Sequence, residues 1–341
     1  MALWVCRAGK LGEYETKFIE DNSVYCTWDD LDWDMSAFSD REAFKQEVRK
    51  TYPGIGTKLL GIWTGQLWAF SHSISTGDLV MLPSKIRPQV IYVGEVLSEY
   101  KFSAEADLLY QHTHSVKWLK EISRKELDPD IKHSSQSSLT IFQIKRPNAE
   151  ARIRKMLKVP VPPTATQQPP PDDSEPEEIE EVDIEDAALQ EIADRLIAKY
   201  KGHGLAKIVA AILEAKGFTT WVSPPGPDNG VDILASRGSL GFDPPRICVQ
   251  VKSGDNALER TVLDQLVGAM TNHKADYGML VSWGGFKSTI QREEANQFFK
   301  VRLWTHREII KEFLQHYEDL PEEIHETIPL KRIWIIDKRA E

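Results

Sequence analysis

The fold of the C-terminal half is decided by two neighbouring stretches, Gly217-Phe-Thr-Thr-Trp-Val-Ser-Pro-Pro-Gly-Pro-Asp-Asn-Gly-Val-Asp-Ile-Leu-Ala235 and Ile247-Cys-Val-Gln-Val-Lys-Ser-Gly254. Asp232 opens an apolar run, and the second stretch presents Gln250 and Lys252 two residues apart. Because successive side chains of a strand alternate between its faces, Gln250 and Lys252 share one face and the intervening valines share the other. A hairpin-like connection of roughly ten residues brings Asp232 beside this pair.

An acid, an amide carbonyl and a lysine at one strand end suit a hard cation and an attacking water. A solvent-facing edge strand without a catalytic function can contain the same residues at the same spacing. This is the structural alternative to the catalytic interpretation. The Gly-Val-Asp turn and the strand pair occur together, which favours the functional interpretation. The sequence therefore predicts that Asp232, Gln250 and Lys252 form a catalytic site.

These residues resemble the core of PD-(D/E)XK nucleases, in the variant where glutamine replaces the second acid. The closest match is to Mrr-type restriction endonucleases, whose pattern is Gly-aromatic, a loop, Asp-x-Gly-Val-Asp and then Gln-x-Lys. The matching residues are Gly217-Phe218, Asp228-Asn-Gly-Val-Asp232 and Gln250-Val-Lys252. The resemblance covers residues 200–317. It implies an α/β nuclease core that cuts double-stranded DNA with Mg²⁺, or with Mn²⁺.

The resemblance also implies the role of each site residue. Asp232 is the principal metal ligand, Gln250 adds its side-chain carbonyl oxygen, and the backbone carbonyl of Val251 assists. Lys252 orients the attacking water, or helps deprotonate it, and stabilises charge on the phosphate. Cutting both strands takes two nuclease domains, which implies a homodimer at least on DNA.

An amphipathic helix is predicted upstream, with apolar residues at i, i+3, i+4, i+7 and i+8 from Leu205 and an end at Gly217. In Mrr-type enzymes this helix begins Phe-Glu, and the glutamate helps organise the metal site. Leu205-Ala206 stands there in this chain, so the helix acid is missing. The resemblance then implies weaker catalysis or an altered metal geometry. Glu214 lies two turns later and is interpreted as a solvated charge.

Helical and strand patterns alternate after the motif. Alternation of this kind is typical of an α/β layered domain. The predicted helices are 261–273, 287–299 and 307–316, and the predicted strands are 277–283 and 301–304.

The charge of the chain is unevenly distributed. Its formal net charge is −10, and segment 159–190 alone holds ten acids and no Lys or Arg. Both flanking parts are therefore near neutral, so the acidic balance does not exclude DNA binding. The length of 341 residues is enough for two ordinary domains.

Cysteine usage and hydropathy limit the compartment. Cys6, Cys26 and Cys248 are too few and too scattered for a disulfide framework or a zinc site. The N-terminus does not resemble a signal peptide, and no apolar run approaches the length of a membrane span. We therefore expect a cytoplasmic protein without a membrane partner.

A proline-rich and acidic segment, residues 159–186, separates the predicted domains 1–158 and 187–341. Such composition cannot build a core and favours an extended linker. Its acidity is interpreted as a solubility device. The alternative is an acidic strip that competes with DNA for a basic groove until DNA displaces it.

The N-terminal half alternates strand-like and helical runs. Strands are predicted at 3–7, 24–28, 78–82, 90–96 and 140–144, with a helix at 40–50. The order resembles the PUA-like superfamily, in particular EVE-type and YTH-like domains, over residues 2–145. The residues that carry it are Trp4, Trp28, the Gly77-Asp-Leu-Val80 turn and Gly94-Glu-Val96. It implies a β-barrel with short helices that holds a modified base in an aromatic pocket.

Trp28 and Trp33 are the candidates for that pocket, because they flank the polar stretch Asp29-Asp-Leu-Asp32. Two aromatic rings that flank a polar loop can stack on the two faces of a base, while the Asp29 side chain hydrogen-bonds to the edge of that base. The alternative is that the rings pack over the barrel mouth. His114 is placed near the pocket as a polar contact or as a structural residue, since no cysteine or acid accompanies it for metal binding.

The predicted fold class is thus α+β and α/β, with an N-terminal PUA-like β-barrel and a C-terminal PD-(D/E)XK core. The combination of a domain that recognises modified bases with a tethered nuclease predicts a modification-dependent, type IV-like restriction endonuclease. Two alternatives stay open. In the first, the nuclease fold is inactive and the chain only binds DNA. In the second, the N-terminal domain senses RNA or a nucleotide second messenger and licenses the nuclease.

Overall fold

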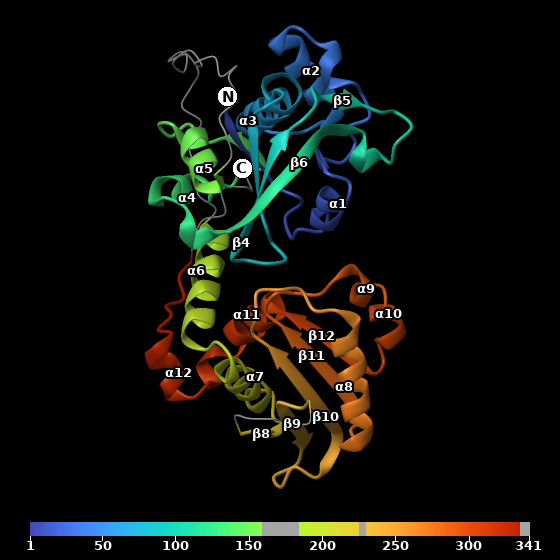
Figure 1. The fold of residues 1–341 in the computed structure, drawn as a ribbon, viewed down its shortest axis with the longest axis vertical. Helices are drawn as coiled ribbons and strands as arrows, with labels where there is room; N and C mark the ends of the chain where they lie inside the picture. Colours follow the sequence, from blue (N-terminus) through green and yellow to red (C-terminus); the bar gives the residue numbers. More distant parts are fainter. Residues whose placement is uncertain (159–183, 225–229, 335–341) are drawn as a thin grey trace. The chain divides into compact units, whose positions relative to one another are not determined.

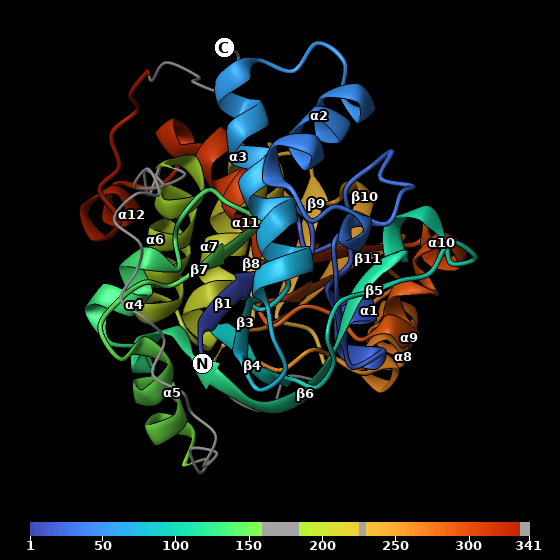
Figure 2. The same cartoon turned by 90° about the horizontal axis from the view of Figure 1, so that it is seen from above.

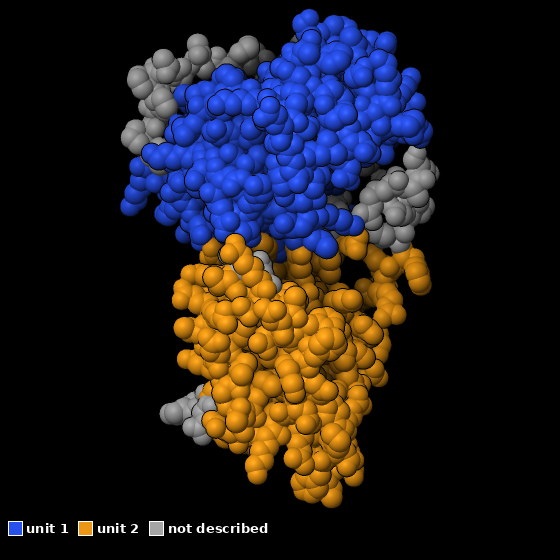
Figure 3. Space-filling view, turned by 90° about the vertical axis from the view of Figure 1, so that its right-hand side faces the viewer, with its two compact units in different colours: residues 1–85, 89–184, 337–341 blue, residues 86–88, 185–336 orange. Residues whose placement is uncertain are grey.

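The computed structural model describes residues 1–158, 184–224 and 230–334. The described residues divide into two compact units (Figure 3), one of residues 1–85, 89–158 and 184 and one of residues 86–88, 185–224 and 230–334. The predicted linker lies outside the described residues except for its last three positions. The exact domain boundaries and the role of the acidic linker therefore stay predictions.

The first unit is built on one mixed sheet with the strand order β2-β6-β4-β3-β1-β7, and β5 pairs with β6. The strands are β1 (Leu3–Cys6), β2 (Ser23–Tyr25), β3 (Leu79–Pro83), β4 (Val90–Val96), β5 (Lys101–Phe102), β6 (His112–Ser123) and β7 (Ile141–Gln143). β1 and β3 are parallel, and the other neighbours are antiparallel. The long curved strand β6 pairs with β4, β2 and β5 (Figures 1 and 2).

Helices cover both faces of this sheet. They are α1 (Glu15–Glu20), α2 (Arg41–Thr51), α3 (Thr57–Trp68), α4 (Pro129–Ser134) and α5 (Ala149–Leu157), with shorter helical turns at Met35–Ala37, Ala69–Ser73, Leu108–Tyr110 and Arg124–Glu126. Trp4 and Cys6 of β1 belong to a core with residues of α1, α2 and α3. Leu3 and Val5, on the other face, belong to a core with residues of α4 and α5. The continuous apolar run of β1 follows from this burial on both sides.

The closed PUA-like barrel is not confirmed. Within the described residues the sheet is open, with β2 and β7 as its edge strands. A small barrel encloses one core, whereas this sheet separates two cores and so forms a layer between helices. Each predicted strand overlaps an observed one, but β5 and the long strand β6 were not predicted.

The second unit contains a five-stranded sheet with the order β12-β11-β10-β9-β8. Its strands are β8 (Thr219–Val222), β9 (Ile233–Arg237), β10 (Asp243–Lys252), β11 (Tyr277–Ser282) and β12 (Val301–Thr305). β10, β11 and β12 are parallel, while β8, β9 and β10 form an antiparallel meander. The carboxyl ends of the three parallel strands therefore meet at one edge of the sheet.

Helices lie on both sides of this second sheet. They are α6 (Ile184–Lys199), α7 (His203–Ala215), α8 (Arg260–Asn272), α9 (Ser288–Gln291), α10 (Glu294–Gln297), α11 (His306–Gln315) and α12 (Glu322–Thr327), with one 3₁₀ turn at Tyr317–Asp319. The predicted helix at 287–299 is instead two short helices, because α10 buries none of its side chains and lacks an apolar stripe. Among the described residues, no helix has the length and apolar character that a membrane crossing requires.

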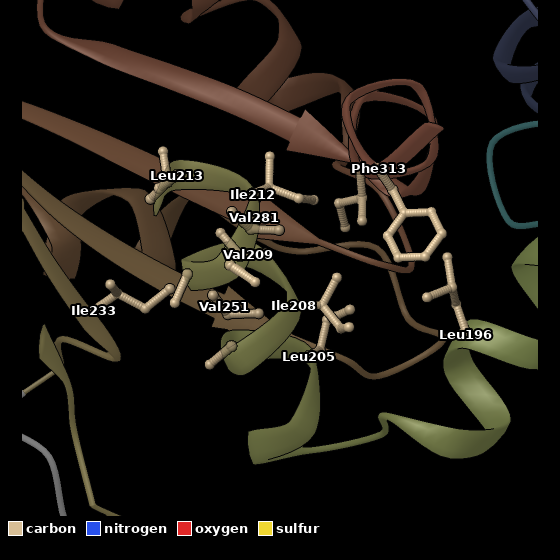
Figure 4. Close-up of a cluster of buried hydrophobic side chains, with 14 of the residues drawn as sticks. Leu196, Leu205, Ile208, Val209, Ile212, Leu213, Ile233, Val251, Val281 and Phe313 are labelled. Carbon is tan, nitrogen blue, oxygen red and sulfur yellow. The ribbon is translucent and has the colours of Figure 1, made fainter. Parts of the chain in front are cut away.

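The amphipathic helix α7 anchors the larger core of this unit. Its apolar side chains point toward the sheet, where they meet Ile233, Val251 and Val281, and toward Phe313 of α11 (Figure 4). The opposite face of the sheet carries Cys248 and packs on α8. β10 is therefore buried on both faces, and its carboxyl end is held rigidly between two helical layers.

Candidate functional site

The strand register brings the three predicted catalytic residues together. Ile233 of β9 faces Val249 of β10, so Asp232 and Gln250 are neighbours across the two strands. Val249 and Val251 belong to the core that contains α7. Gln250 and Lys252 alternate with them, as the period of two predicts.

Backbone and side-chain hydrogen bonds fix Asp232. Its N–H donates to the carbonyl of Val249 at 2.9 Å, and its carbonyl accepts from the N–H of Ser223 at 2.9 Å. Oδ2 of the carboxylate accepts from the N–H of Val251 at 2.7 Å. The N–H and C=O of one residue in an antiparallel strand point to the same edge, so the Val251 carbonyl is also directed toward Asp232.

Gln250 carries a buried acceptor that has no donor. Its side chain is 3% exposed, and Oε1 lacks a hydrogen-bond partner within the described residues. Leaving a buried polar atom unsatisfied costs about 1–3 kcal/mol. A cation or a metal-bound water at this position would remove that cost, so the residue fits the ligand role that the resemblance implies.

The oxygen donors present suit a hard cation. A carboxylate, an amide oxygen and a backbone carbonyl are ligands that Mg²⁺ accepts, and Mg²⁺ usually keeps several waters besides. No group of three or more His, Cys, Asp or Glu side chains in the described part of the chain is arranged to hold a metal. The described residues at this strand end offer a mixed set of oxygen donors instead, one carboxylate, one amide and one backbone carbonyl.

Lys252 ends β10 with an uncommitted ammonium group. Its side chain is half-buried, and it makes no hydrogen bond or ion pair with the described residues. Its backbone carbonyl accepts from the N–H of Trp283 at 2.9 Å, which fixes the end of the strand. The amine is therefore positioned by its backbone and available to a phosphate or a water.

A cleft of about 540 Å³ opens at this end of the sheet. The residues that line it are Gly202, His203, Ala206, Ser223, Pro224, Asp232, Val251, Lys252, Ser253, Gly254, Asn256 and Leu258. Three of the four residues predicted to act there, Asp232, Val251 and Lys252, line it, whereas Gln250 lies buried outside this lining. Asp228, which belongs to the motif, lies outside the described residues.

The first turn of α7 forms one wall of the cleft. Gly202 precedes the helix without a side-chain cap, and its N–H donates to Oγ of Ser253 at 2.8 Å. Ala206, the position where the resemblance places a glutamate, lines the same cleft as Asp232. Glu214 is exposed at the far end of the helix, where it accepts a hydrogen bond from Oγ1 of Thr220.

Sequence reasoning gave no role to four polar side chains of the described cleft lining, His203, Ser223, Ser253 and Asn256. His203 and Asn256 line it, although neither belongs to the Asp…Gln-x-Lys pattern. His203 is three residues before Ala206, one turn away on the same side of the helix. That spacing from the position of the missing acid was the available signal.

In the first unit, the two tryptophans of the predicted base pocket belong to different aromatic groups. Nε1–H of Trp33 donates to Oγ1 of Thr51 at 2.8 Å, and its ring packs edge-on against Phe38 and Phe44. Trp28 instead lies 4.9 Å from Trp63, measured between ring centroids. Trp33 is half-buried and packs against the core beneath it, whereas the predicted base pocket stays a prediction.

His114 also has a structural environment. It is 0% exposed, and its two ring nitrogens lie 3.0 Å from the carbonyl oxygen of Ser98 and 2.7 Å from that of Phe70. Both nitrogens thus have backbone partners inside the core. Of the two roles considered for this residue, these contacts favour the structural one.

A partly exposed aromatic group remains around Trp28. Trp63 lies between Trp28 and Tyr52, with ring centroids 4.9 Å from each, and all three rings are half-buried. The hydroxyl of Tyr52 donates to the carbonyl of Asp29, and the Asp29 side chain is exposed. Tyr52 directly follows α2 and Trp63 belongs to α3, so their position beside Trp28 depends on tertiary structure.

Comparisons with known proteins assign the second unit. Residues 197–313 match a restriction endonuclease family, and residues 4–145 match a domain of unknown function, DUF8426. The C-terminal unit therefore contains a restriction endonuclease domain. The PUA-like assignment of the N-terminal unit is not confirmed.

The structure is also similar to solved restriction enzymes. The DNA modification-dependent restriction endonuclease AspBHI aligns with a TM-score of 0.34 and 12% identity, covering 81% of this chain and 76% of that one. The MspJI restriction endonuclease, in complex with a 27-mer oligonucleotide, aligns with a TM-score of 0.29 and 15% identity, covering 81% and 71%. No curated protein matches the chain.

Proposed function

We propose that the restriction endonuclease domain hydrolyses phosphodiester bonds of double-stranded DNA with Mg²⁺, through Asp232, Gln250 and Lys252. One observation carries the proposal. The Asp232 carboxylate accepts the Val251 N–H at 2.7 Å, its cross-strand neighbour Gln250 carries a buried amide oxygen without a donor among the described residues, and Lys252 has no partner among them. An acid and an uncommitted cation that line one cleft, next to an unsatisfied buried oxygen on the same strand, suit hydrolysis of a phosphodiester.

Each residue has a distinct task in this proposal. Asp232, the Gln250 side-chain oxygen and the Val251 carbonyl would hold the cation, which would supply Lewis-acid activation of the phosphate. Lys252 stabilises charge that develops on the phosphate oxygens and orients the attacking water. The N-terminus of α7, which lines the cleft, adds a partial positive charge that favours the anionic substrate. Mn²⁺ is the alternative cation because it accepts the same oxygen ligands.

The first unit is proposed to supply specificity for modified DNA, as in type IV-like restriction. The support is the half-buried group of Trp28, Trp63 and Tyr52 beside the exposed Asp29. Stacking on aromatic rings and edge recognition by a carboxylate are the elements of a flipped-base reader. A homodimer on DNA is proposed because one cleft cuts one strand at a time.

One observation favours a second candidate, a DNA-binding protein without catalysis. Ala206 lines the cleft at the position where the resemblance places a glutamate, so the described site offers a single carboxylate, Asp232. With less negative charge around it, a cation is held more weakly. The two candidates differ in cleavage and not in DNA affinity.

A cleavage assay with matched substrates tests the proposal. Full-length protein is incubated with one DNA prepared unmodified, with methylated, hydroxymethylated or glucosylated cytosine, and with methylated adenine, each with Mg²⁺ and with excess EDTA. We expect metal-dependent cuts in at least one modified DNA and few in the unmodified one. Binding without cleavage of any substrate supports the second candidate. Equal cleavage of all substrates favours a first unit that senses RNA or a nucleotide messenger.

A further inference from the structure

The cleft contains three titratable side chains among its described lining residues, His203, Asp232 and Lys252. The proposed function gives tasks to two of them, and His203 has none. His203 is the first residue of α7 and is half-buried, and its ring makes no hydrogen bond or ion pair with the described residues. A side chain of this kind is available to a substrate or a water in the cleft.

Hydrolysis needs a group that accepts a proton near neutral pH. The Asp232 carboxylate already accepts the Val251 N–H and is assigned to the cation. Lysine side chains are cationic near neutral pH, whereas an imidazole titrates there and offers a lone pair in its neutral form. Among the described residues of the cleft wall, His203 is therefore the side chain best suited to take up a proton.

We propose that His203 is a catalytic residue that accepts a proton from the attacking water. The inference rests on the proposed function and extends it to a residue outside the Asp…Gln-x-Lys pattern. The water oxygen forms a bond to phosphorus as one of its protons passes to the imidazole, and the bond from phosphorus to the leaving deoxyribose oxygen breaks. That oxygen takes a proton from solvent, and the imidazolium returns its proton to solvent in the next step.

The position on α7 explains why this role falls to residue 203. Residues three apart on a helix lie on one side of it, and both His203 and Ala206 line the cleft. With alanine at 206, no carboxylate extends from this helix toward the cation. The small side chain of Ala206 takes up less of the cleft than a glutamate side chain would.

The charges around His203 are mixed. Asp232, which directly precedes β9, and Lys252 of β10 line the same cleft. Lys207 is exposed one turn after His203 on α7. Lys201, just before the helix, forms an ion pair of 3.8 Å with Asp255. The described charged residues of the cleft and of the first turns of α7 are therefore of both signs.

The test compares the pH dependence of cleavage for the full-length protein, His203→Gln and His203→Ala. General base catalysis contributes about 10²–10⁴-fold, so we expect kcat/KM of His203→Gln to fall by that range, with KM changed less than about threefold. In the wild type, activity should fall at acidic pH because protonation of an imidazole removes activity. This acidic limb of the pH profile should be absent from His203→Gln. Added free imidazole should restore part of the activity of His203→Ala and none of the activity of Asp232→Asn.

Controls separate this inference from the proposed function. His273→Gln changes an exposed histidine at the end of α8, so its activity and pH profile should equal those of the wild type. Wild-type activity and an unchanged acidic limb in His203→Gln would overturn the role of His203 alone. A loss without imidazole rescue and with the acidic limb retained would also overturn it, since it indicates a structural effect. Activity in Asp232→Asn would overturn the proposed function itself.

Discussion

The N–H of Val251 donates to Oδ2 of Asp232 at 2.7 Å, which joins the residue before β9 to the strand that carries Gln250 and Lys252. The donor is a backbone group, so its position is set by the β10–β11 pairing rather than by a rotamer. A charge-assisted bond to a carboxylate is stronger than one between neutral groups. The acid is thereby oriented before any cation or DNA arrives, and the following predictions depend on this arrangement.

The substitution Gln250→Leu should lower the rate of DNA cleavage without lowering the stability of the protein. The substitution removes a buried oxygen that has no hydrogen-bond donor in the described structure, so the free energy of unfolding should stay unchanged or rise by up to about 1–3 kcal/mol. Cleavage should fall by about a hundredfold or more, as is typical when one preorganised polar group is lost. Urea denaturation and cleavage kinetics measure the two effects. Gln250→Glu is the control that keeps an oxygen, and full activity of Gln250→Leu would remove Gln250 from the site.

Ala206→Glu tests the missing helix acid. Ala206 lines the cleft, so a carboxylate there should reach the cation and lower the Mg²⁺ concentration needed for half-maximal cleavage. Extending the side chain of a residue that is 1% exposed crowds the helix, so a loss of stability of about 1–3 kcal/mol is expected as well. Ala206→Gln is the control for crowding without charge. The same metal dependence in all three proteins would show that residue 206 is remote from the cation.

The first unit gives a prediction about base recognition. Full-length Trp28→Ala should lose any preference for modified over unmodified DNA and keep a weak, salt-sensitive affinity, because stacking is worth about 1–3 kcal/mol per base. Fluorescence anisotropy without metal, at two salt concentrations, measures both quantities. Trp33→Ala should instead lower the unfolding temperature, since its ring packs against Phe38 and Phe44. A preference that survives Trp28→Ala would place the reader elsewhere.

Protonation of His112 should lower the stability of the first unit as the pH falls. Nε2 of His112 lies 2.8 Å from the carbonyl of Leu31, and Nδ1 lies 2.7 Å from the hydroxyl of Tyr100. Burial lowers the pKa of His112 below its usual 6.5. The unfolded chain therefore takes up the proton first, so this contribution is complete above 6.5 and is lost as the pH falls toward the folded value.

His112→Gln removes that titration. The wild type should be more stable than this variant near neutral pH, and the difference between their free energies of unfolding should narrow from about pH 7.5 to about pH 5.5. Urea denaturation at several pH values measures it. A difference that is constant or grows on acidification would contradict the assignment.

Much of the second unit was predictable from local pattern. The alternation around Gln250 and Lys252, and the helical spacing from Leu205, each follow from burial on a sheet that is covered on both faces. The split of the predicted helix at 287–299 was not, because the end of a helix depends on whether its apolar residues find a core. His203 shares a side of α7 with Ala206, but its place in the cleft and the burial of Gln250 outside the lining depend on how α7 meets β10.

The first unit likewise combines features that the local sequence predicts with features that depend on tertiary structure. Five of its described strands were found because apolar runs mark them, whereas β5 and β6 were not predicted. Closure into a barrel depends on pairing between strands far apart in sequence, and β2 and β7 do not pair within the described residues. Trp28 and Trp33 look equivalent in sequence. Their contacts differ because α2 contributes Phe44 to one ring and α3 contributes Trp63 to the other.

The most direct measurement is the rate of Mg²⁺-dependent DNA cleavage by Asp232→Asn. This variant keeps an oxygen that can accept the Val251 N–H, so the fold and the DNA affinity should be preserved. Loss of one essential member of a catalytic group costs several orders of magnitude, so we predict a rate lower by at least about 10³-fold. Asp264→Asn, which removes an exposed acid of α8 paired with Arg260, should cleave at the wild-type rate. Cleavage by Asp232→Asn at the wild-type rate would contradict the assignment of this cleft as the nuclease site.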